Sequence, residues 1–159
     1  MGNYDMSLPP GRTYKYYSGP PLFEFGSGLS LTTFTLDCHH LEDQHQQAAP
    51  NNLSSLSFSC NVANTGSRDG DEVLMAFHAA GPGIRYAAAE AGHPVPLKSL
   101  VGFDRVSVAA GRSVVCVLEL GMDSLLLVNG EGDRVLYRGE RSILVSDGAG
   151  QQEKFIVTA

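Results

Sequence analysis

Residues 53–62 read Leu-Ser-Ser-Leu-Ser-Phe-Ser-Cys-Asn-Val, and this stretch decides the fold class. Apolar side chains recur at every second position, at Leu56, Phe58, Cys60 and Val62. A period of two places these four side chains on one face of a strand, because successive side chains point to opposite faces. The polar residues between them then face water. The stretch therefore predicts a half-buried β-strand.

Similar stretches return along the chain at intervals of about ten residues, with turn sequences between them. Residues 81–96 are rich in Gly, Ala and Pro and are expected to form a long loop. Met122–Leu126 has room for one helical turn, and no long stretch carries a helical period. The pattern predicts an all-β protein, an antiparallel β-sandwich of about seven strands. Strands are expected at 31–41, 53–62, 72–80, 100–108 and 113–120, and hairpins at 125–137 and 142–158.

The first 30 residues differ from the rest of the chain. Seven of the 13 aromatic residues lie within residues 1–34, interleaved with Pro and Gly at a density that disfavours a regular helix. We expect an extended arm that carries large apolar rings. Such an arm cannot bury its rings against itself, so it needs a surface on this chain or on another domain.

Composition excludes several classes of function. The chain has 159 residues, which fits one domain, and a formal net charge of -6, which disfavours binding to nucleic acid or to an anionic membrane. No apolar run approaches the roughly 20 residues of a membrane span. Met1–Met6 lacks the basic and apolar regions of a secretory leader. Asn52 begins a glycosylation tripeptide that matters only if the chain is secreted.

Three cysteines, at 38, 60 and 116, all lie in strand-like stretches. An odd number leaves at least one thiol unpaired. The simplest interpretation is buried, reduced thiols that act as small hydrophobic side chains. A bridge between Cys38 and Cys60 is an alternative if their strands are neighbours, and the sequence leaves this open.

No catalytic, cofactor or metal motif is present in the sequence. Cys38, His39, His40 and His45 suggest a metal site, but Cys38 and His40 share one strand face while His39 points to the other. The acidic residues of 69–72 do not match the spacing of a calcium loop and read as a turn before a strand. No pair of carboxylates can be assigned to glycoside hydrolysis. We therefore predict no catalytic residue, no metal and no cofactor.

Four segments carry a resemblance to a known family. They are Pro10-Gly-Arg-Thr-Tyr-Lys-Tyr-Tyr17 with Pro20–Phe34, then Val62–Val73 with its Asn-Thr-Gly turn, Pro96–Val106, and Gly111–Leu120. In order and spacing they resemble the C-terminal fibronectin type III-like domain of family 3 glycoside hydrolases, in the β-xylosidase, α-arabinofuranosidase and β-glucosidase branch. Ser27 departs from the family, which usually has an aromatic residue there, and the polar loop 42–52 looks longer than usual.

The resemblance implies a fibronectin III-like sandwich over residues 31–159, with residues 1–30 as an inter-domain arm that leaves a catalytic core. In the family, a retaining glycoside hydrolase, both catalytic residues lie on preceding domains. The expected function is a non-catalytic accessory domain that braces that core, with polysaccharide as a further partner. The family is usually secreted, vacuolar or periplasmic, and this chain shows no address of its own.

Two groups of residues follow from these motifs. The expected inter-domain interface consists of Tyr14, Tyr16, Tyr17, Pro21, Phe23, Phe25, Gly26 and Gly28. The expected fold motif consists of Asn64, Gly66, Asp69, Gly70, Gly102 and Phe103. The alternative function is a free-standing module that binds carbohydrate or protein, in which the arm's tyrosines stack on sugar faces and residues 81–96 form a rim.

Overall fold

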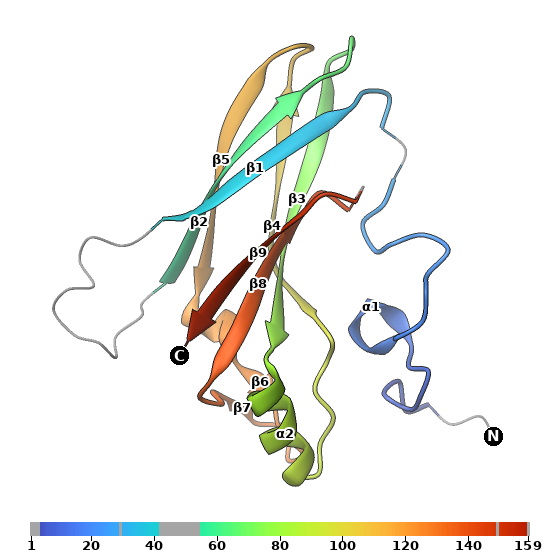
Figure 1. The fold of residues 1–159 in the computed structure, drawn as a ribbon, viewed down its shortest axis with the longest axis vertical. Coiled ribbons are helices and arrows are strands. Elements are labelled where there is room, and N and C mark those ends of the chain that lie inside the picture. Colours follow the sequence, from blue (N-terminus) through green and yellow to red (C-terminus); the bar gives the residue numbers. More distant parts are fainter. Residues whose placement is uncertain (1–3, 29, 42–54, 149, 159) are drawn as a thin grey trace, which may run out of the picture.

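The computed structural model describes residues 4–28, 30–41, 55–148 and 150–158 and shows two antiparallel sheets packed face to face (Figure 1). The prediction of an all-β sandwich is confirmed. One sheet has the order β1-β2-β5 and the other the order β4-β3-β8-β9. The strands are β1 (Phe34–Leu41), β2 (Ser55–Asn64), β3 (Gly70–Ala80), β4 (Ser99–Val108), β5 (Ser113–Gly121), β8 (Glu140–Ser146) and β9 (Gln152–Thr158).

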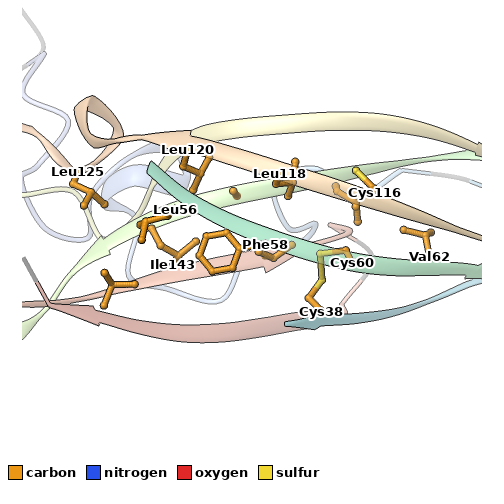
Figure 2. Packing of buried hydrophobic residues seen from close by; sticks show 14 of the residues in the cluster. Cys38, Leu56, Phe58, Cys60, Val62, Cys116, Leu118, Leu120, Leu125 and Ile143 are labelled. Atoms are coloured by element: carbon orange, nitrogen blue, oxygen red, sulfur yellow. A yellow bond between two sulfur atoms is a disulfide. The ribbon is translucent and has the colours of Figure 1, made fainter. Parts of the chain in front are cut away.

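The alternation in β2 gives the core of the sandwich. Leu56, Phe58, Cys60 and Val62 are all buried, as the period of two predicted. They pack against inward-facing residues of the other strands, among them Leu118, Leu120 and Ile143 (Figure 2). Burying a Leu, Val or Phe side chain contributes about 1.5–3 kcal/mol each, so this cluster is the main stabilising element of the fold.

Strand β3 is buried on both faces from Leu74 to Phe77. Leu74 and Ala76 face the interior and belong to the core. Met75 and Phe77 point to the outer face of their sheet, yet both are buried as well. The arm supplies their cover, since Phe77 lies in ring contact with two arm residues. A strand in the middle of a four-stranded sheet thus separates the core from a second apolar layer.

Residues 81–96 do not form only a loop, so that prediction was wrong. Helix α2 (Pro82–Glu90) lies there, below β3 in Figure 1. Pro82 stands in the first turn, where its fixed φ suits a helix, and the alanines that follow have the highest helix propensity. Ile84 and Ala88, four residues apart, are buried on one helix face.

The shorter elements follow the sequence closely. A 3₁₀ turn, η2 (Met122–Leu125), stands where one helical turn was expected. Strands β6 (Leu127–Val128) and β7 (Arg134–Val135) form the first predicted hairpin, and β8 pairs with β9 in the second. Neither α1 nor α2 within the described residues has the length and apolar character that a membrane crossing needs.

The arm runs beside the β3–β8 face of the sandwich and is not fully extended (Figure 1). It contains one helical turn, α1 (Thr13–Tyr16), in which the Tyr17 N–H donates to the Thr13 carbonyl at 2.9 Å. The density of Pro and Gly excludes a longer helix but leaves room for this single turn between Arg12 and Tyr17.

The cysteines correct a second expectation. Cys38 and Cys60 are Cα partners on β1 and β2 and form a disulfide, so these two are not reduced thiols. Cys116 is buried with a free thiol. The bridge depends on strand register, which the sequence does not specify. The Asn52 tripeptide and the polar loop 42–52 lie outside the described residues.

Candidate functional site

Two rings of the arm face inward and anchor it to the sandwich. Tyr14 and Phe25 stack with their centroids 4.2 Å apart. Their edges meet Phe77 of β3 at centroid distances of 5.8 and 6.1 Å. The Tyr14 hydroxyl accepts a hydrogen bond of 3.3 Å from the Leu100 N–H. These two residues of the expected interface therefore contact their own sandwich.

Gly26 lets the arm approach the sheet closely. Its φ is +91°, a conformation that strains other residues, and a Cβ there would lie 2.1 Å from the Met75 Cε. Gly148, on the β8–β9 turn, approaches the same point. No such constraint acts at Gly28, where a Cβ would meet nothing within 4 Å. Ser27 turns its hydroxyl back to the Glu24 carbonyl.

Other arm side chains are largely exposed to solvent. Leu22 is 96% exposed and Phe23 is 84% exposed. Pro21 is exposed beside them, and Tyr17 and Tyr16 are partly exposed. Exposure on this scale is unusual for neighbouring large apolar side chains of a folded protein. The expected interface thus divides into an inward anchor and an outward apolar tip, defined here as Pro21, Leu22 and Phe23.

A pocket of about 500 Å³ lies between part of the arm and the sandwich. Its walls are mainly rings, those of Tyr14, Tyr17, Phe23 and Phe25, with the Glu24 and Lys98 side chains as its charged groups. The Lys98 ammonium lies 4.8 Å from the Phe77 ring centroid, a cation–π contact. The pocket has the size of a small-molecule site but no converging acids.

Asn64 is the hub of the fold motif. Its side chain is buried and satisfies four hydrogen bonds. The Oδ1 atom accepts from the Thr32 hydroxyl at 2.6 Å and from the Gly66 N–H at 3.0 Å. The Nδ2 atom donates to the Arg68 carbonyl at 2.7 Å and the Val108 carbonyl at 2.9 Å. One amide therefore joins the segment before β1, the 64–70 turn and the end of β4.

Gly66 and Gly70 of the motif make room for Thr32 at this hub. A Cβ on Gly66 would lie 2.2 Å from the Thr32 hydroxyl oxygen, and one on Gly70 would lie 2.7 Å from the Thr32 methyl. Asp69 accepts a hydrogen bond of 2.9 Å from the Ala110 N–H, which fixes the neighbouring turn. A larger residue at 66 or 70 would clash with Thr32 and displace the segment before β1.

Gly102 and Phe103 lie on opposite faces of β4. A Cβ on Gly102 would be 2.6 Å from the Leu120 Cδ2, so the glycine allows the two sheets to close along their β4–β5 edge. Phe103 points outward, opposite Met75 in the register, and is largely exposed. It is a second exposed ring on the face along which the arm runs.

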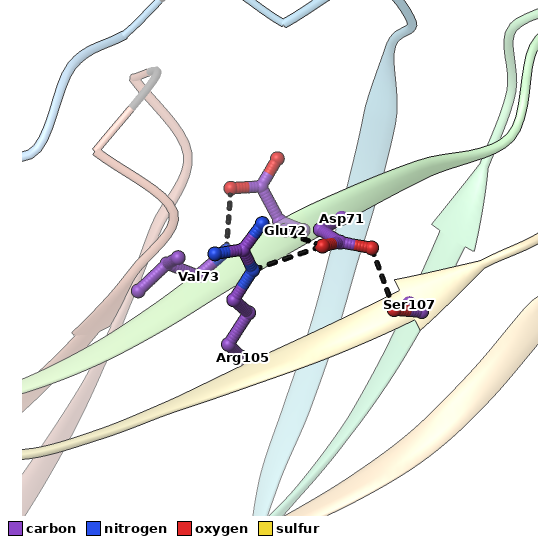
Figure 3. Close-up of polar contacts among 5 residues, drawn as sticks. All are labelled: Asp71, Glu72, Val73, Arg105 and Ser107. Carbon is purple, nitrogen blue, oxygen red and sulfur yellow. Dashed lines mark hydrogen bonds and ion pairs between the residues drawn. The ribbon is translucent and has the colours of Figure 1, made fainter.

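The acidic residues at the start of β3 have structural partners (Figure 3). The Asp71 carboxylate accepts from the Ser107 hydroxyl at 2.6 Å and from Arg105 at 2.6 and 2.9 Å. These hydrogen bonds hold the pKa of Asp71 below its usual range. Glu72 accepts from the Val73 N–H, and burial raises its pKa. Both carboxylates therefore take part in local structural contacts.

A basic cluster at the α2 end of the sandwich was missed by the sequence analysis. Arg141 is fully buried and donates to the carbonyls of Leu125 and Tyr137. Arg85 of α2 donates to the carbonyls of Ala80, Pro96 and Leu97 and so holds the segment after α2. The period of two in Arg141, Ile143 and Val145 was the signal, because it places Arg141 on the interior face.

The residues considered for metal binding have other contacts. Cys38 is in the disulfide, and the His40 ring packs 5.1 Å from the Phe58 ring. His45 lies outside the described residues. Within residues 4–28, 30–41, 55–148 and 150–158, no three His, Cys, Asp or Glu side chains are grouped so as to hold a metal ion.

Comparison with known proteins agrees with the fold. Residues 85–149 match the family model of the fibronectin type III-like domain. The exo-1,4-β-xylosidase xlnD of Aspergillus oryzae is 34% identical over 155 residues, which cover 87% of this chain and 18% of the relative. The xlnD protein of Emericella nidulans is 32% identical, covering 86% of this chain and 19% of the relative.

Solved structures give the same result. The β-glucosidase DesR of Streptomyces venezuelae superposes with a TM-score of 0.68 at 25% identity, covering 87% of this chain and 16% of that enzyme. A β-glucosidase of Listeria innocua superposes with a TM-score of 0.69 at 19% identity, covering 96% of this chain and 21% of that one. The latter similarity supports the fold alone.

The fold, the motif around Asn64 and the family model define a fibronectin type III-like β-sandwich. Over most of its length the chain is similar to the domains of this type in family 3 glycoside hydrolases, and the resemblance seen in its sequence motifs is confirmed. It spans about a fifth of the length of the relatives that it matches and aligns with a part of them that is not the catalytic one.

Proposed function

We propose that this chain braces the catalytic domains of a longer glycoside hydrolase, with residues 1–30 as the arm between them. Its relatives are named as β-xylosidases and β-glucosidases, and it matches only about a fifth of each. A β-sandwich that aligns with a small, non-catalytic part of such enzymes fits a supporting role. Cleavage of a β-linked xyloside or glucoside is then the activity of the whole protein.

The outward apolar tip is the observation that carries this proposal. Leu22 and Phe23 are almost fully exposed, although Tyr14 and Phe25 on either side of them are docked. Covering a Leu or Phe side chain contributes about 1.5–3 kcal/mol. A neighbouring domain that covered both would therefore gain several kcal/mol from these two residues alone.

The other interface residues have complementary roles in the proposal. Tyr14, Phe25 and Gly26 hold the base of the arm on the sheet. Tyr16 and Tyr17, which are half-buried or at the margin of exposure, form the rim with hydroxyls available for hydrogen bonds to a partner. Gly28 has open space around it, which leaves room for a neighbouring backbone.

A chimera tests the bracing role. This chain would replace the matching region of the A. oryzae xylosidase, and the half-life of aryl β-xyloside hydrolysis at elevated temperature would be compared between variants. Leu22→Ser with Phe23→Ser should shorten the half-life several-fold, because the tip no longer gains free energy from burial. Tyr86→Ser is the matched control, since Tyr86 is an exposed ring on α2. Equal half-lives for the double variant and the control would contradict the proposal.

The pocket favours a second candidate function, contact with polysaccharide. Its aromatic walls offer faces on which sugar rings stack, and Glu24 and Lys98 offer polar groups at its margin. Because the chain has no tryptophan, its emission comes from six tyrosines, of which Tyr14 and Tyr17 line the pocket. Titration with xylo-oligosaccharides or cello-oligosaccharides should change this emission, and Phe23→Ala should weaken the response. A flat titration at millimolar sugar would remove this candidate.

A further inference from the structure

The three cysteines lie in one row across the β1-β2-β5 sheet. Cys60 is the Cα partner of Cys38 on β1 and of Cys116 on β5. All three side chains are buried in the sandwich core, and Figure 2 shows the bond from Cys60 to Cys38 with Cys116 unbonded. Thiol–disulfide exchange requires a free thiol within reach of a disulfide, and the pairing of Cys116 with Cys60 puts a free thiol on the strand next to this one.

The hydrogen-bond pattern of β2 determines which type of pair Cys60 forms with each neighbouring strand. The Asn64 N–H donates to the Arg112 carbonyl beyond β5, whereas the Thr65 N–H donates to the Thr33 carbonyl before β1. Even-numbered residues of β2 therefore form hydrogen-bonded pairs with β5 and non-hydrogen-bonded pairs with β1. Cys60 is even-numbered, and its Cα distance of 4.0 Å to Cys38 agrees with a non-hydrogen-bonded pair.

The Cys60–Cys116 pair is then of the hydrogen-bonded kind, with a Cα separation of about 5.5 Å. Disulfides are found at Cα separations of about 4.4–6.8 Å. The Cα separation therefore permits a bond between Cys60 and Cys116. Because Cys38 and Cys116 stand on opposite sides of Cys60, an attacking sulfur approaches from the side away from the leaving sulfur.

The Cys116 thiol is hydrogen-bonded and protonated in the native state. Its Sγ donates to the Asp104 Oδ2 at 3.2 Å. Burial, together with this hydrogen bond, raises the pKa of Cys116 to about 11. The thiol is therefore protonated near neutral pH, and the bond stays with Cys38. Asp104 is exposed on β4, so its carboxylate connects the buried thiol with solvent.

We propose that Cys60 exchanges its disulfide partner between Cys38 and Cys116. The Cys116 proton passes to solvent by way of the Asp104 carboxylate, and the thiolate attacks the Sγ of Cys60. The bond between Cys60 and Cys116 forms as the bond to Cys38 breaks, and Cys38 leaves as a thiolate that takes up a proton. One disulfide and one thiol are present before and after, so no oxidant or reductant is consumed.

The exchange changes which strand is cross-linked. β1 is an edge strand that follows directly from the arm, and in the native isomer it is bonded covalently to β2. After exchange, β1 has no covalent bond to β2 and is held by its ladder with β2, by packing of Phe34 and Leu36 against the core, and by the Gln151 side chain, which bonds the Leu36 N–H and the Phe34 carbonyl. The disulfide isomer thus sets whether β2 is cross-linked to β1 or to β5.

Trapping the free thiol in the wild-type chain tests the proposal. The chain would be incubated with iodoacetamide at about pH 9, where more thiolate is present, until one thiol per molecule is labelled. Digestion with trypsin and a glutamate-specific protease, which cuts after Glu42, separates the three cysteines for mass spectrometry. We expect label on Cys38 together with a Cys60–Cys116 bond. Label on Cys116 alone would overturn the proposal.

A variant gives a second, independent readout. In Cys38→Ser, oxidised glutathione should drive formation of the Cys60–Cys116 bond, with no free thiol left after denaturation. Cys116→Ser is the matched control and should keep the Cys38–Cys60 bond. If Cys38→Ser retains the near-ultraviolet circular dichroism of the wild type and both thiols stay free, the exchange is excluded. If this variant does not fold, the labelling of the wild-type chain decides.

Discussion

Replacing Asn64 with alanine should destabilise the sandwich more than the same substitution at any other polar residue of the 64–70 turn. Asn64 is 2% exposed, and its amide makes all four hydrogen bonds described above. A typical hydrogen bond contributes about 0.5–1.5 kcal/mol, and a buried partner left unsatisfied costs about 1–3 kcal/mol.

The magnitude follows from which partners can find water after the substitution. The Thr32 hydroxyl can rotate to solvent, and the Arg68 carbonyl lies at an exposed turn. The Val108 carbonyl is in a buried hydrogen bond and has no replacement. We therefore expect Asn64→Ala to lower the free energy of unfolding by about 3 kcal/mol. For a domain of this size this corresponds to a melting temperature lower by roughly 6–12 °C.

Urea unfolding followed by tyrosine fluorescence, with the disulfide intact, measures the change. Asn61→Ala is the matched control, because Asn61 is an exposed asparagine on the same strand and should change the free energy by less than about 0.5 kcal/mol. Hydrogen exchange should also show faster exchange at the Gly66 amide, which loses its acceptor. If Asn64→Ala unfolds at the same urea concentration as Asn61→Ala, the reasoning about the hub is wrong.

Three further predictions address other parts of the fold. Burial lowers the pKa of His78 from 6.5 to about 4, and the nearby charge of Arg141 is the next largest cause. As the pH falls, the unfolded chain therefore takes up a proton at this histidine before the folded chain does. The free energy of unfolding should fall by up to about 3 kcal/mol between pH 6.5 and pH 4. Urea titrations across this range should show a smaller fall for His78→Gln, while exposed His39→Gln should behave like the wild type. Gly102→Val should cost about 1–3 kcal/mol by overpacking against Leu120, and a double-mutant cycle with Leu120→Ala should show favourable coupling; additive effects would contradict this contact. Gln151→Ala should speed amide exchange at Leu36, whereas exposed Gln152→Ala should not, and equal protection in both would exclude the clamp on β1.

Much of the sandwich was readable from the sequence because its strands obey a local rule. Leu56, Phe58, Cys60 and Val62 alternate with polar residues, and the structure buries all four. Asn-Gly at 129 and Asp-Gly at 147 mark hairpins whose turns those residues favour, and both hairpins are present. In these segments the periodicity and the turn chemistry point to the same answer, so no long-range information is needed.

The features that the sequence did not predict depend on partners distant in the chain. Cys38 and Cys60 bond because β1 and β2 align them, and register is a property of the sheet. Helix α2 has a proline at its start but no side-chain cap, and it gains its stability from packing Ile84 and Ala88 against the end of the sandwich. Arg141 is tolerated in the interior because carbonyls at the α2 end accept from it.

The arm shows how a supporting domain can be prepared for its partner. Tyr14 and Phe25 already stack over Phe77, and the Leu97 N–H donates to the Lys15 carbonyl at 2.5 Å, so the base of the arm is ordered within this chain. Fixing a backbone residue costs about 1–2 kcal/mol in conformational entropy. Because the chain itself bears this cost, burial of Leu22 and Phe23 by a neighbouring domain would appear almost entirely as binding free energy. The inward rings therefore act on binding indirectly, and Tyr14→Ala should weaken the brace as much as loss of the tip itself.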